Sequence, residues 1–187
     1  MSTPRRPNRT EIAAAVGKTV ADVLAANLKV LFCGINPGLY TAAIGHHFGR
    51  PGNRFWPALY AAGFTDRLLS PYEERELLSV GCGITNIVAR ASARADDLTA
   101  DELREGARIL ERKVARNRPM FLAFLGITAY RTAFARPRAV LGRQAEMLAD
   151  SAIWVLPNPS GLNAHHSAAD LARLFGELRQ SAFPGSA

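Results

Sequence analysis

The length and composition of the chain are those of one soluble globular domain. Its 187 residues are 48% hydrophobic and 21% charged, which is enough apolar material for a substantial core. No apolar run approaches the roughly 18 residues that a membrane-spanning helix needs. The Arg-rich start lacks the apolar stretch of a secretory signal. We therefore expect a flexible basic arm over 1–10, one domain over 11–187, and no contact with a membrane.

The charge balance favours a polyanionic partner. Lys and Arg outnumber Asp and Glu by 23 to 16, which gives a net charge of +7. Most of the excess is Arg, whose planar fork of donors suits phosphate. A basic protein of this size is a candidate for binding nucleic acid. Arg-rich chains also arise from GC-rich bacterial genomes without any functional cause, so charge alone does not decide the question.

Taken in chain order, the sequence alternates between predicted helices and strands. An Ala-rich segment over 12–26 favours a helix with an interruption at Gly17. Short apolar runs predict buried strands over 29–35, 83–88, 120–125 and 152–156. Capped or amphipathic segments predict helices over 53–63, 71–78, 99–117, 127–134 and 167–180. This order predicts a three-layer α/β/α sandwich with a mainly parallel central sheet of about four to five strands.

Two loops that leave predicted strands carry unusual residues. The first runs over 36–52 and begins Asn36-Pro37-Gly38, and the second begins Asn158-Pro159. Proline keeps the preceding residue extended, so each Asn side chain stands on a stiff mount. An Asn-Pro-Gly sequence by itself is more often a plain turn. In parallel sheets, however, ligands bind beyond the carboxyl ends of the strands, and two such loops facing one crevice indicate a site.

At this point the chain resembles the mismatch-specific uracil-DNA glycosylase and thymine-DNA glycosylase family. The resemblance extends from about residue 27 to residue 180 and is carried by four strings in order. They are Gly34-Ile35-Asn36-Pro37-Gly38, Asn53-Arg54-Phe55-Trp56, Gly83-Ile84-Thr85-Asn86 and Leu156-Pro157-Asn158-Pro159-Ser160-Gly161-Leu162. The resemblance implies the uracil-DNA glycosylase fold. It also implies a monofunctional enzyme of base excision repair, which flips a base out of the duplex and hydrolyses its N-glycosidic bond to leave an abasic site.

The resemblance also implies a substrate and a setting. The substrate is uracil in a G-mismatch of double-stranded DNA, with ethenocytosine and thymine as further candidates. No cofactor or metal is expected. We expect a monomer in the cytoplasm of a bacterium, associated with the nucleoid through its DNA.

The family pattern assigns a role to individual residues. Asn36 positions the attacking water, Phe48 stacks under the flipped base, and Asn158 helps to hold the base. Thr41 and the wall opposite Phe48 are expected to decide whether the thymine methyl group fits. The remaining base-binding candidates are Ile35 and His47; the wedge and strand candidates are Ser160, Gly161, Leu162, Asn163, Arg50, Arg54 and Arg90.

The chain departs from the family pattern at several positions. Relatives often carry Arg after the wedge, where this chain has Ala164. Relatives also carry a carboxylate after the valine at position 88, where this chain has Ala89, and no Asp or Glu occurs between Glu76 and Asp96. If a carboxylate assists catalysis in relatives, this chain lacks it, and Ala89 or Ala93 is where a replacement would stand.

Two alternatives to an active glycosylase remain open. The first is a catalytically weak or inactive protein that binds mismatched DNA. The second is a metal-dependent hydrolase, because the histidines form two pairs on the two loops, His46-His47 and His165-His166. The two cysteines, Cys33 and Cys82, are too few for a four-cysteine zinc or iron–sulfur site. Both lie in apolar stretches and are predicted to be buried free thiols.

Overall fold

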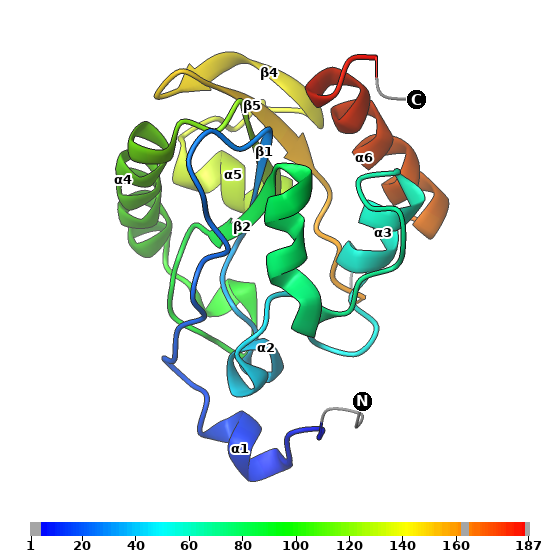
Figure 1. Cartoon of the computed structure of the whole chain (residues 1–187). Coiled ribbons are helices and arrows are strands. Elements are labelled where there is room, and N and C mark those ends of the chain that lie inside the picture. Colours follow the sequence, from blue (N-terminus) through cyan, green and yellow to red (C-terminus); the bar gives the residue numbers. More distant parts are fainter. Residues whose placement is uncertain (1–4, 162–164, 186–187) are drawn as a thin grey trace.

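A five-stranded sheet forms the centre of the protein in the computed structural model, which describes residues 5–161 and 165–185 (Figure 1). Its strand order is β2-β1-β3-β5-β4. Four neighbouring strands are parallel, and the edge strand β4 runs antiparallel to β5. The strands are β1 (Val30–Gly34), β2 (Cys82–Asn86), β3 (Phe121–Leu125), β4 (Gly142–Leu148) and β5 (Ser151–Leu156).

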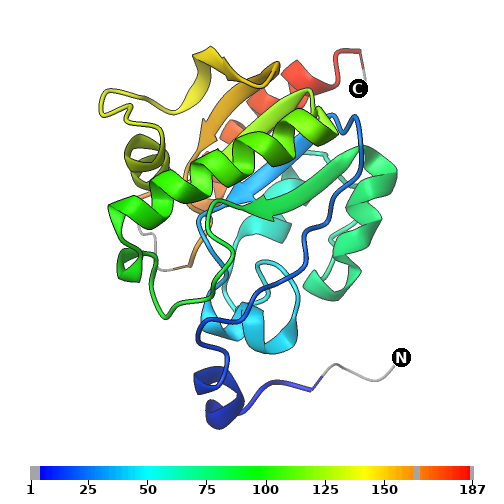
Figure 2. The same cartoon turned by 90° about the vertical axis from the view of Figure 1, so that its left-hand side faces the viewer.

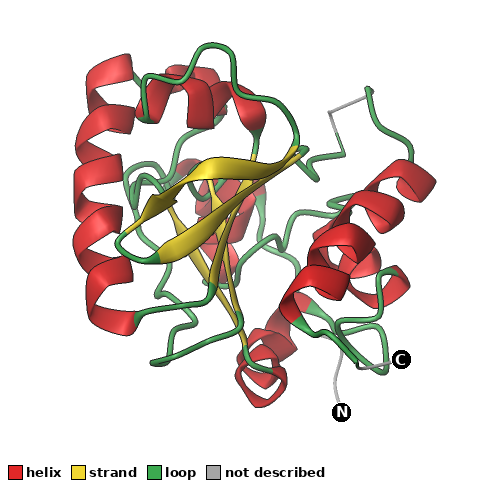
Figure 3. Cartoon of the chain, turned by 90° about the horizontal axis from the view of Figure 1, so that it is seen from above, coloured by secondary structure: helices red, strands yellow, loops and turns green. Residues whose placement is uncertain are grey.

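Helices cover both faces of the sheet. On one face lie α3 (Phe55–Ala61), α6 (Ala168–Ala182) and the 3-10 helix η1 (Pro71–Val80). The other face is covered by α4 (Ala100–Asn117) and α5 (Ile127–Ala133). Seen from above, the sheet lies between these two groups (Figure 3). The predicted three-layer α/β/α fold with a mainly parallel sheet is confirmed.

The four parallel strands consist mainly of apolar residues because both of their faces are buried. In β1, Val30 and Phe32 pack on the α3 and α6 side, whereas Leu31 and Cys33 pack on the α4 and α5 side. The Phe32 ring meets the Phe55 ring edge-on at a centroid distance of 5.4 Å. This alternation explains why the strands appear in the sequence as continuous apolar runs.

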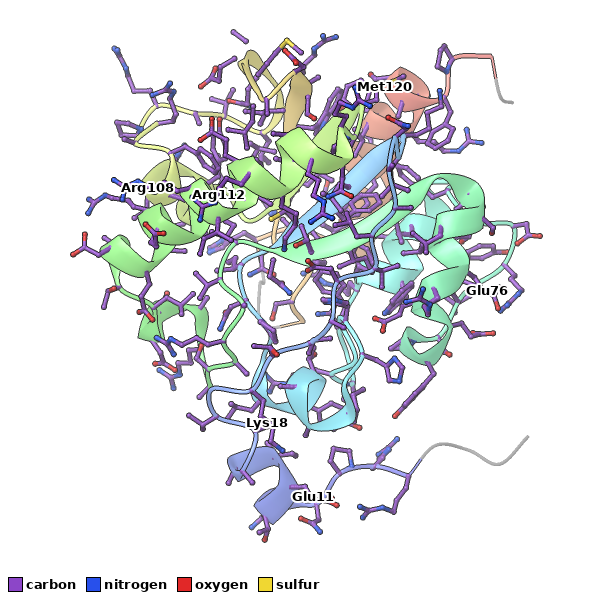
Figure 4. All side chains as sticks on the ribbon, turned by 60° about the vertical axis from the view of Figure 1, so that its left-hand side comes forward. Glu11, Lys18, Glu76, Arg108, Arg112 and Met120 are labelled. Carbon is purple, nitrogen blue, oxygen red and sulfur yellow. The ribbon has the colours of Figure 1, made fainter. Side chains whose placement is uncertain are left out.

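The long helix α4 lies across its face of the sheet (Figure 2). The predicted capping box is present: Thr99 Oγ1 accepts from the Glu102 N–H, and the Glu102 carboxylate accepts from the Thr99 N–H. Leu110 is buried against the sheet, whereas Arg108 and Arg112 point away from it on the exposed face (Figure 4). No helix among the described residues is long and apolar enough to cross a membrane.

The structure differs from the sequence predictions in four places. The predicted helix over 12–26 is wrong: α1 (Arg9–Ala13) ends before Gly17, whose φ of +75° stops the helix. Residues 15–23, named here the N-terminal strap, then run on without helix. The short helix α2 (Leu39–Ile44) lies inside the first loop, and β4 forms where no strand was predicted. A further short 3-10 helix, η2, spans Ala95–Asp97.

Both cysteines are buried free thiols, as predicted. Burial raises the pKa of Cys82 to about 12. Burial also raises the pKa of Cys33, which lies in the sheet beside Thr85 of β2. Both thiols therefore stay protonated and act as core packing groups at neutral pH.

Candidate active site at the carboxyl edge of the sheet

The ends of β1, β3 and β5 meet at one edge of the sheet. Gly126, directly after β3, has a φ of +141° and donates its N–H to Leu156 O at 2.9 Å. A Cβ at Gly126 would lie 3.0 Å from Ile35 Cδ1 and 3.9 Å from Asn158 Cβ. Glycine at this position thus leaves room for Ile35, just before the first loop, and for Asn158, at the start of the second.

The side chain of Asn36 is held by the segment that follows β2. Its Nδ2 donates to Arg90 O at 3.0 Å and to Ser92 Oγ at 2.8 Å. The β1–β2 pairing continues past the strands to deliver these partners, because Val88 donates its N–H to Ile35 O at 2.9 Å. Asn36 is partly buried, and these two hydrogen bonds hold its amide in place.

Phe48 lies beside the end of β1. Its backbone is in the left-handed region, with a φ of +53°, which an L side chain rarely adopts. The ring stacks on Phe55 at a centroid distance of 4.0 Å and an interplanar angle of 27°. A Cβ at Gly34 would lie 3.5 Å from Phe48 Cζ. The first loop thus holds a partly buried aromatic ring next to the end of β1, two residues before Asn36.

His47 is directed into the protein. Its side chain is buried, and its Nε2 lies 3.0 Å from Ala21 O in the N-terminal strap. A carbonyl oxygen only accepts, so Nε2 carries the proton. Burial lowers the pKa of His47 below its ordinary value. The prediction that His47 contacts the base is therefore not retained, because its ring is buried against the N-terminal strap.

Glu74 on η1 contacts both residues of the pair His46-His47. One carboxylate oxygen accepts the His47 N–H at 2.7 Å, and the other lies 3.0 Å from His46 Nδ1. Glu74 is buried, with 6% of its surface exposed. Sequence reasoning missed this residue because it looks like one more acid in the first turns of an exposed helix.

The second loop is tied to the first. Asn158 Oδ1 accepts the Ser160 N–H at 2.9 Å, which closes a turn within the loop. A Cβ at Gly161 would lie 2.5 Å from Gly52 O, so the two loops touch through their backbones. Leu162 and Asn163, the predicted wedge, lie outside the described residues.

Arg54 anchors the second loop. Its backbone N–H donates to Pro159 O at 2.9 Å. Its guanidinium donates to Ser160 O at 3.2 Å and to His166 O at 2.5 Å. The predicted phosphate contact is therefore replaced, for this side chain, by contacts with the backbone of the loop.

The other predicted arginines are placed differently from each other. Arg90 binds both carboxylate oxygens of Glu102, at 2.5 and 2.9 Å, and donates to Asp97 O at 3.2 Å. The Arg90 guanidinium lowers the pKa of Glu102 to about 2. Arg50 is exposed. We therefore retain Arg50, and not Arg90, as the phosphate-contact candidate.

Thr41 is buried, whereas positions 89 and 93, where a replaced carboxylate would stand, are exposed. Thr41 is buried on α2, with 6% exposure. Ala89 and Ala93 are exposed. An acidic side chain at position 89 or 93 would thus meet solvent rather than the core.

The metal-hydrolase alternative lacks a ligand set in the part of the chain that the structure describes. No group of three His, Cys, Asp or Glu side chains there could hold a metal ion.

Comparisons with known proteins identify the fold and the family of the chain. The chain is similar in fold to a proposed uracil DNA glycosylase from Methanosarcina acetivorans, solved by NMR in solution. The two share 18% sequence identity with a TM-score of 0.58, over 88% of this chain and 99% of the other. The model of the uracil DNA glycosylase superfamily matches residues 21–180. The chain belongs to the uracil DNA glycosylase superfamily.

Proposed function

We propose that the protein is a monofunctional DNA glycosylase of base excision repair that removes uracil from G-mismatches in double-stranded DNA. Ethenocytosine and thymine opposite guanine are its further candidate substrates. Membership in the uracil DNA glycosylase superfamily supports the hydrolysis of N-glycosidic bonds in DNA. The observation that carries the proposal is the Asn36 amide, which Arg90 O and Ser92 Oγ fix just after β1, the strand whose last residue, Gly34, lies next to the Phe48 ring.

The chemistry suits an amide rather than a base. Water forms a bond to the sugar C1′ while the C1′–N bond breaks, and the electron pair of that bond leaves with the base. The proton released by the water neutralises the departing base anion. Asn36 accepts a hydrogen bond from the water and holds it in line, and backbone N–H groups around Asn36 stabilise the anion at the uracil O2. No lysine takes part, so the product is an intact abasic site.

The base pocket consists of residues from both loops. Phe48 provides the stacking surface, an interaction worth about 1–3 kcal/mol per base. Ile35 and Asn158 both lie next to Gly126, and Thr41 lies on α2 within the first loop. A methyl group on the base changes binding by roughly 1–3 kcal/mol in such a pocket, and Thr41 is the residue we assign to that discrimination.

The DNA strand is held by the rims of the two loops. Arg50 contacts a phosphate, and Ser160 and Gly161 lead into a wedge formed by Leu162 and Asn163. An apolar wedge fills the space that the flipped base leaves. The protein acts on the duplex as a monomer.

A second candidate is a mismatch-binding protein with weak or no catalysis. It is favoured by one specific observation: the exposed Ala89 follows Val88, where relatives carry a carboxylate, and no acid lies between Glu76 and Asp96.

Single-turnover assays on labelled duplexes separate the two candidates. Substrates carry G:U, A:U, G:T or single-stranded U, with alkali added afterwards to cleave abasic sites. We expect excision from G:U that survives a chelator and falls strongly with Asn36→Ala, whereas Asn117→Ala, at the far end of α4, retains it. Strand cleavage without alkali would contradict the monofunctional mechanism. Binding of the mismatch without excision of any base would favour the second candidate.

A further inference from the structure

We propose that Ser92 is a positioning residue, which fixes the rotation of the Asn36 amide so that its Oδ1 faces the attacking water. The inference rests on the proposed function, because it concerns the water that the glycosylase activates. Ser92 lies 56 residues from Asn36 in sequence, outside all four strings that carry the family resemblance.

The partners of Asn36 define which way its amide points. Arg90 O is a backbone carbonyl oxygen and can only accept a hydrogen bond, so the NH2 group must face it. Ser92 Oγ accepts the second N–H at 2.8 Å. With both N–H groups directed at the 90–92 segment, Oδ1 points the opposite way. Among the described residues, none donates a hydrogen bond to that oxygen.

The Ser92 hydroxyl is itself held in one orientation. A serine hydroxyl has one proton and two lone pairs. Its proton is donated to Arg94 O at 2.6 Å, so toward Asn36 the oxygen can only accept. The Ser92 N–H donates to Pro37 O at 3.2 Å, and the residue is 4% exposed. The hydroxyl is therefore a preset acceptor, and the amide of Asn36 cannot turn over without losing this bond.

The N-terminal strap fixes the segment that contains Ser92. Ala91 donates its N–H to Lys18 O at 2.8 Å and accepts the Gly17 N–H at 3.0 Å. Ala91 also packs with Ala15 of the strap and Ala42 of α2 in a small buried cluster. In Figure 4, Lys18 lies between α1 and the rest of the molecule. The strap thus supports the two acceptors that orient Asn36.

The test is a double-mutant cycle on single-turnover excision of uracil from a G:U duplex. We expect Ser92→Ala to lower the rate constant about tenfold or more, because a misplaced water loses its alignment, while the Kd for the duplex changes less than about twofold. In the Asn36→Ala background, Ser92→Ala should have no further effect. Ser92→Thr, which keeps the hydroxyl, should restore most of the rate.

Ser151→Ala is the matched control. Ser151 is also buried and donates its hydroxyl to a backbone carbonyl, Pro119 O at 2.5 Å, at the start of β5. It should lose stability without losing excision. Equal losses from Ser92→Ala in both backgrounds would show a purely structural role and overturn the proposal, as would an unchanged rate.

If a variant does not fold, a second measurement on the wild-type protein tests the proposal. In the wild-type protein, the side-chain NH2 protons of Asn36 should exchange with solvent more slowly than those of Asn53, whose Oδ1 accepts the Phe55 N–H. Equal exchange would overturn the proposal. If the wild-type protein excises no base, it is the proposed function that fails. The wild-type excision assay therefore distinguishes that failure from a failure of the role assigned to Ser92.

Discussion

The two Asn-Pro loops begin with nearly the same sequence and are stabilised in opposite ways. Asn36 uses its amide nitrogen, and its partners lie 54 and 56 residues away in the chain. Asn158 uses its amide oxygen, and its partner is the N–H of Ser160 two residues away. Both residues follow parallel strands that end at the same edge of the sheet.

The difference teaches which part of each side chain can meet a ligand. An Asn whose oxygen closes its own turn shapes the backbone and presents that backbone to a partner. An Asn whose nitrogen is bound elsewhere presents its oxygen as an acceptor. We therefore assign chemistry to Asn36 and shape to Asn158, although the sequence motif around them is almost the same.

The largest expected effect comes from removing the two amides separately. Asn36→Ala should lower the single-turnover rate by about a hundredfold or more, because the attacking water loses its acceptor. Asn158→Ala should act mainly on binding and raise the Kd for a G:U duplex about tenfold, because the turn loses a hydrogen bond. Rates at saturating enzyme and Kd values measured by fluorescence anisotropy separate the two effects. If the two variants share one profile, the division of roles is wrong.

Arg54 provides a sharper test of the second loop. Arg54→Ala should raise the Kd for the duplex by roughly tenfold, because the loop loses two contacts from the guanidinium. The slope of log Kd against log salt should stay unchanged. The contrasting variant is Arg50→Ala, which should reduce that slope by about 0.9 as one phosphate contact is lost. A reduced slope for Arg54→Ala would return Arg54 to the set of phosphate contacts.

The smallest expected effect is a pH dependence of stability from the first loop. Burial lowers the pKa of His47 in the folded state, whereas in the unfolded chain it titrates near 6.5. Below that pH the unfolded state binds a proton that the folded state does not, so the free energy of unfolding should fall as the pH decreases. His47→Gln, which keeps a donor for Ala21 O, should flatten the curve between about pH 7 and pH 5. Urea denaturation at each pH measures this, and parallel curves for the two proteins would exclude His47 as the source.

Much of the fold was predictable because its elements carry local signals. The continuous apolar run of β1 and the capping box of α4 each identify an element without any partner. The edge strand β4 has no such signal. It alternates half-buried and exposed positions, including Arg143 and Glu146, and contains few residues that favour strands. Its pairing with β5 decides its structure, and pairing cannot be read from the segment itself.

Candidate site residues could be named from the sequence where they match the family's motifs. The role of a residue could not be predicted where it depends on a backbone carbonyl far away in the chain. Asn36 and Phe48 follow from the family resemblance. The direction of His47 follows from Ala21 O, and the role of Arg54 follows from the carbonyls of the second loop. Ser92 has no signal of its own in the sequence, since a serine between two alanines reads as an ordinary loop residue.

The strap has a consequence for the order in which the chain can fold. Val23 exchanges two backbone hydrogen bonds with Ile84, and Asp22 accepts a hydrogen bond from Thr85 and pairs with Lys113. The strap therefore pairs with residues that are synthesised about 60 to 90 positions later, a delay of roughly 3 to 18 s at about 5 to 20 residues per second. Contacts so far apart in sequence close late and at a cost in loop entropy. Nascent chains that end before residue 92 therefore lack the partners that hold the Asn36 amide and the strap in place.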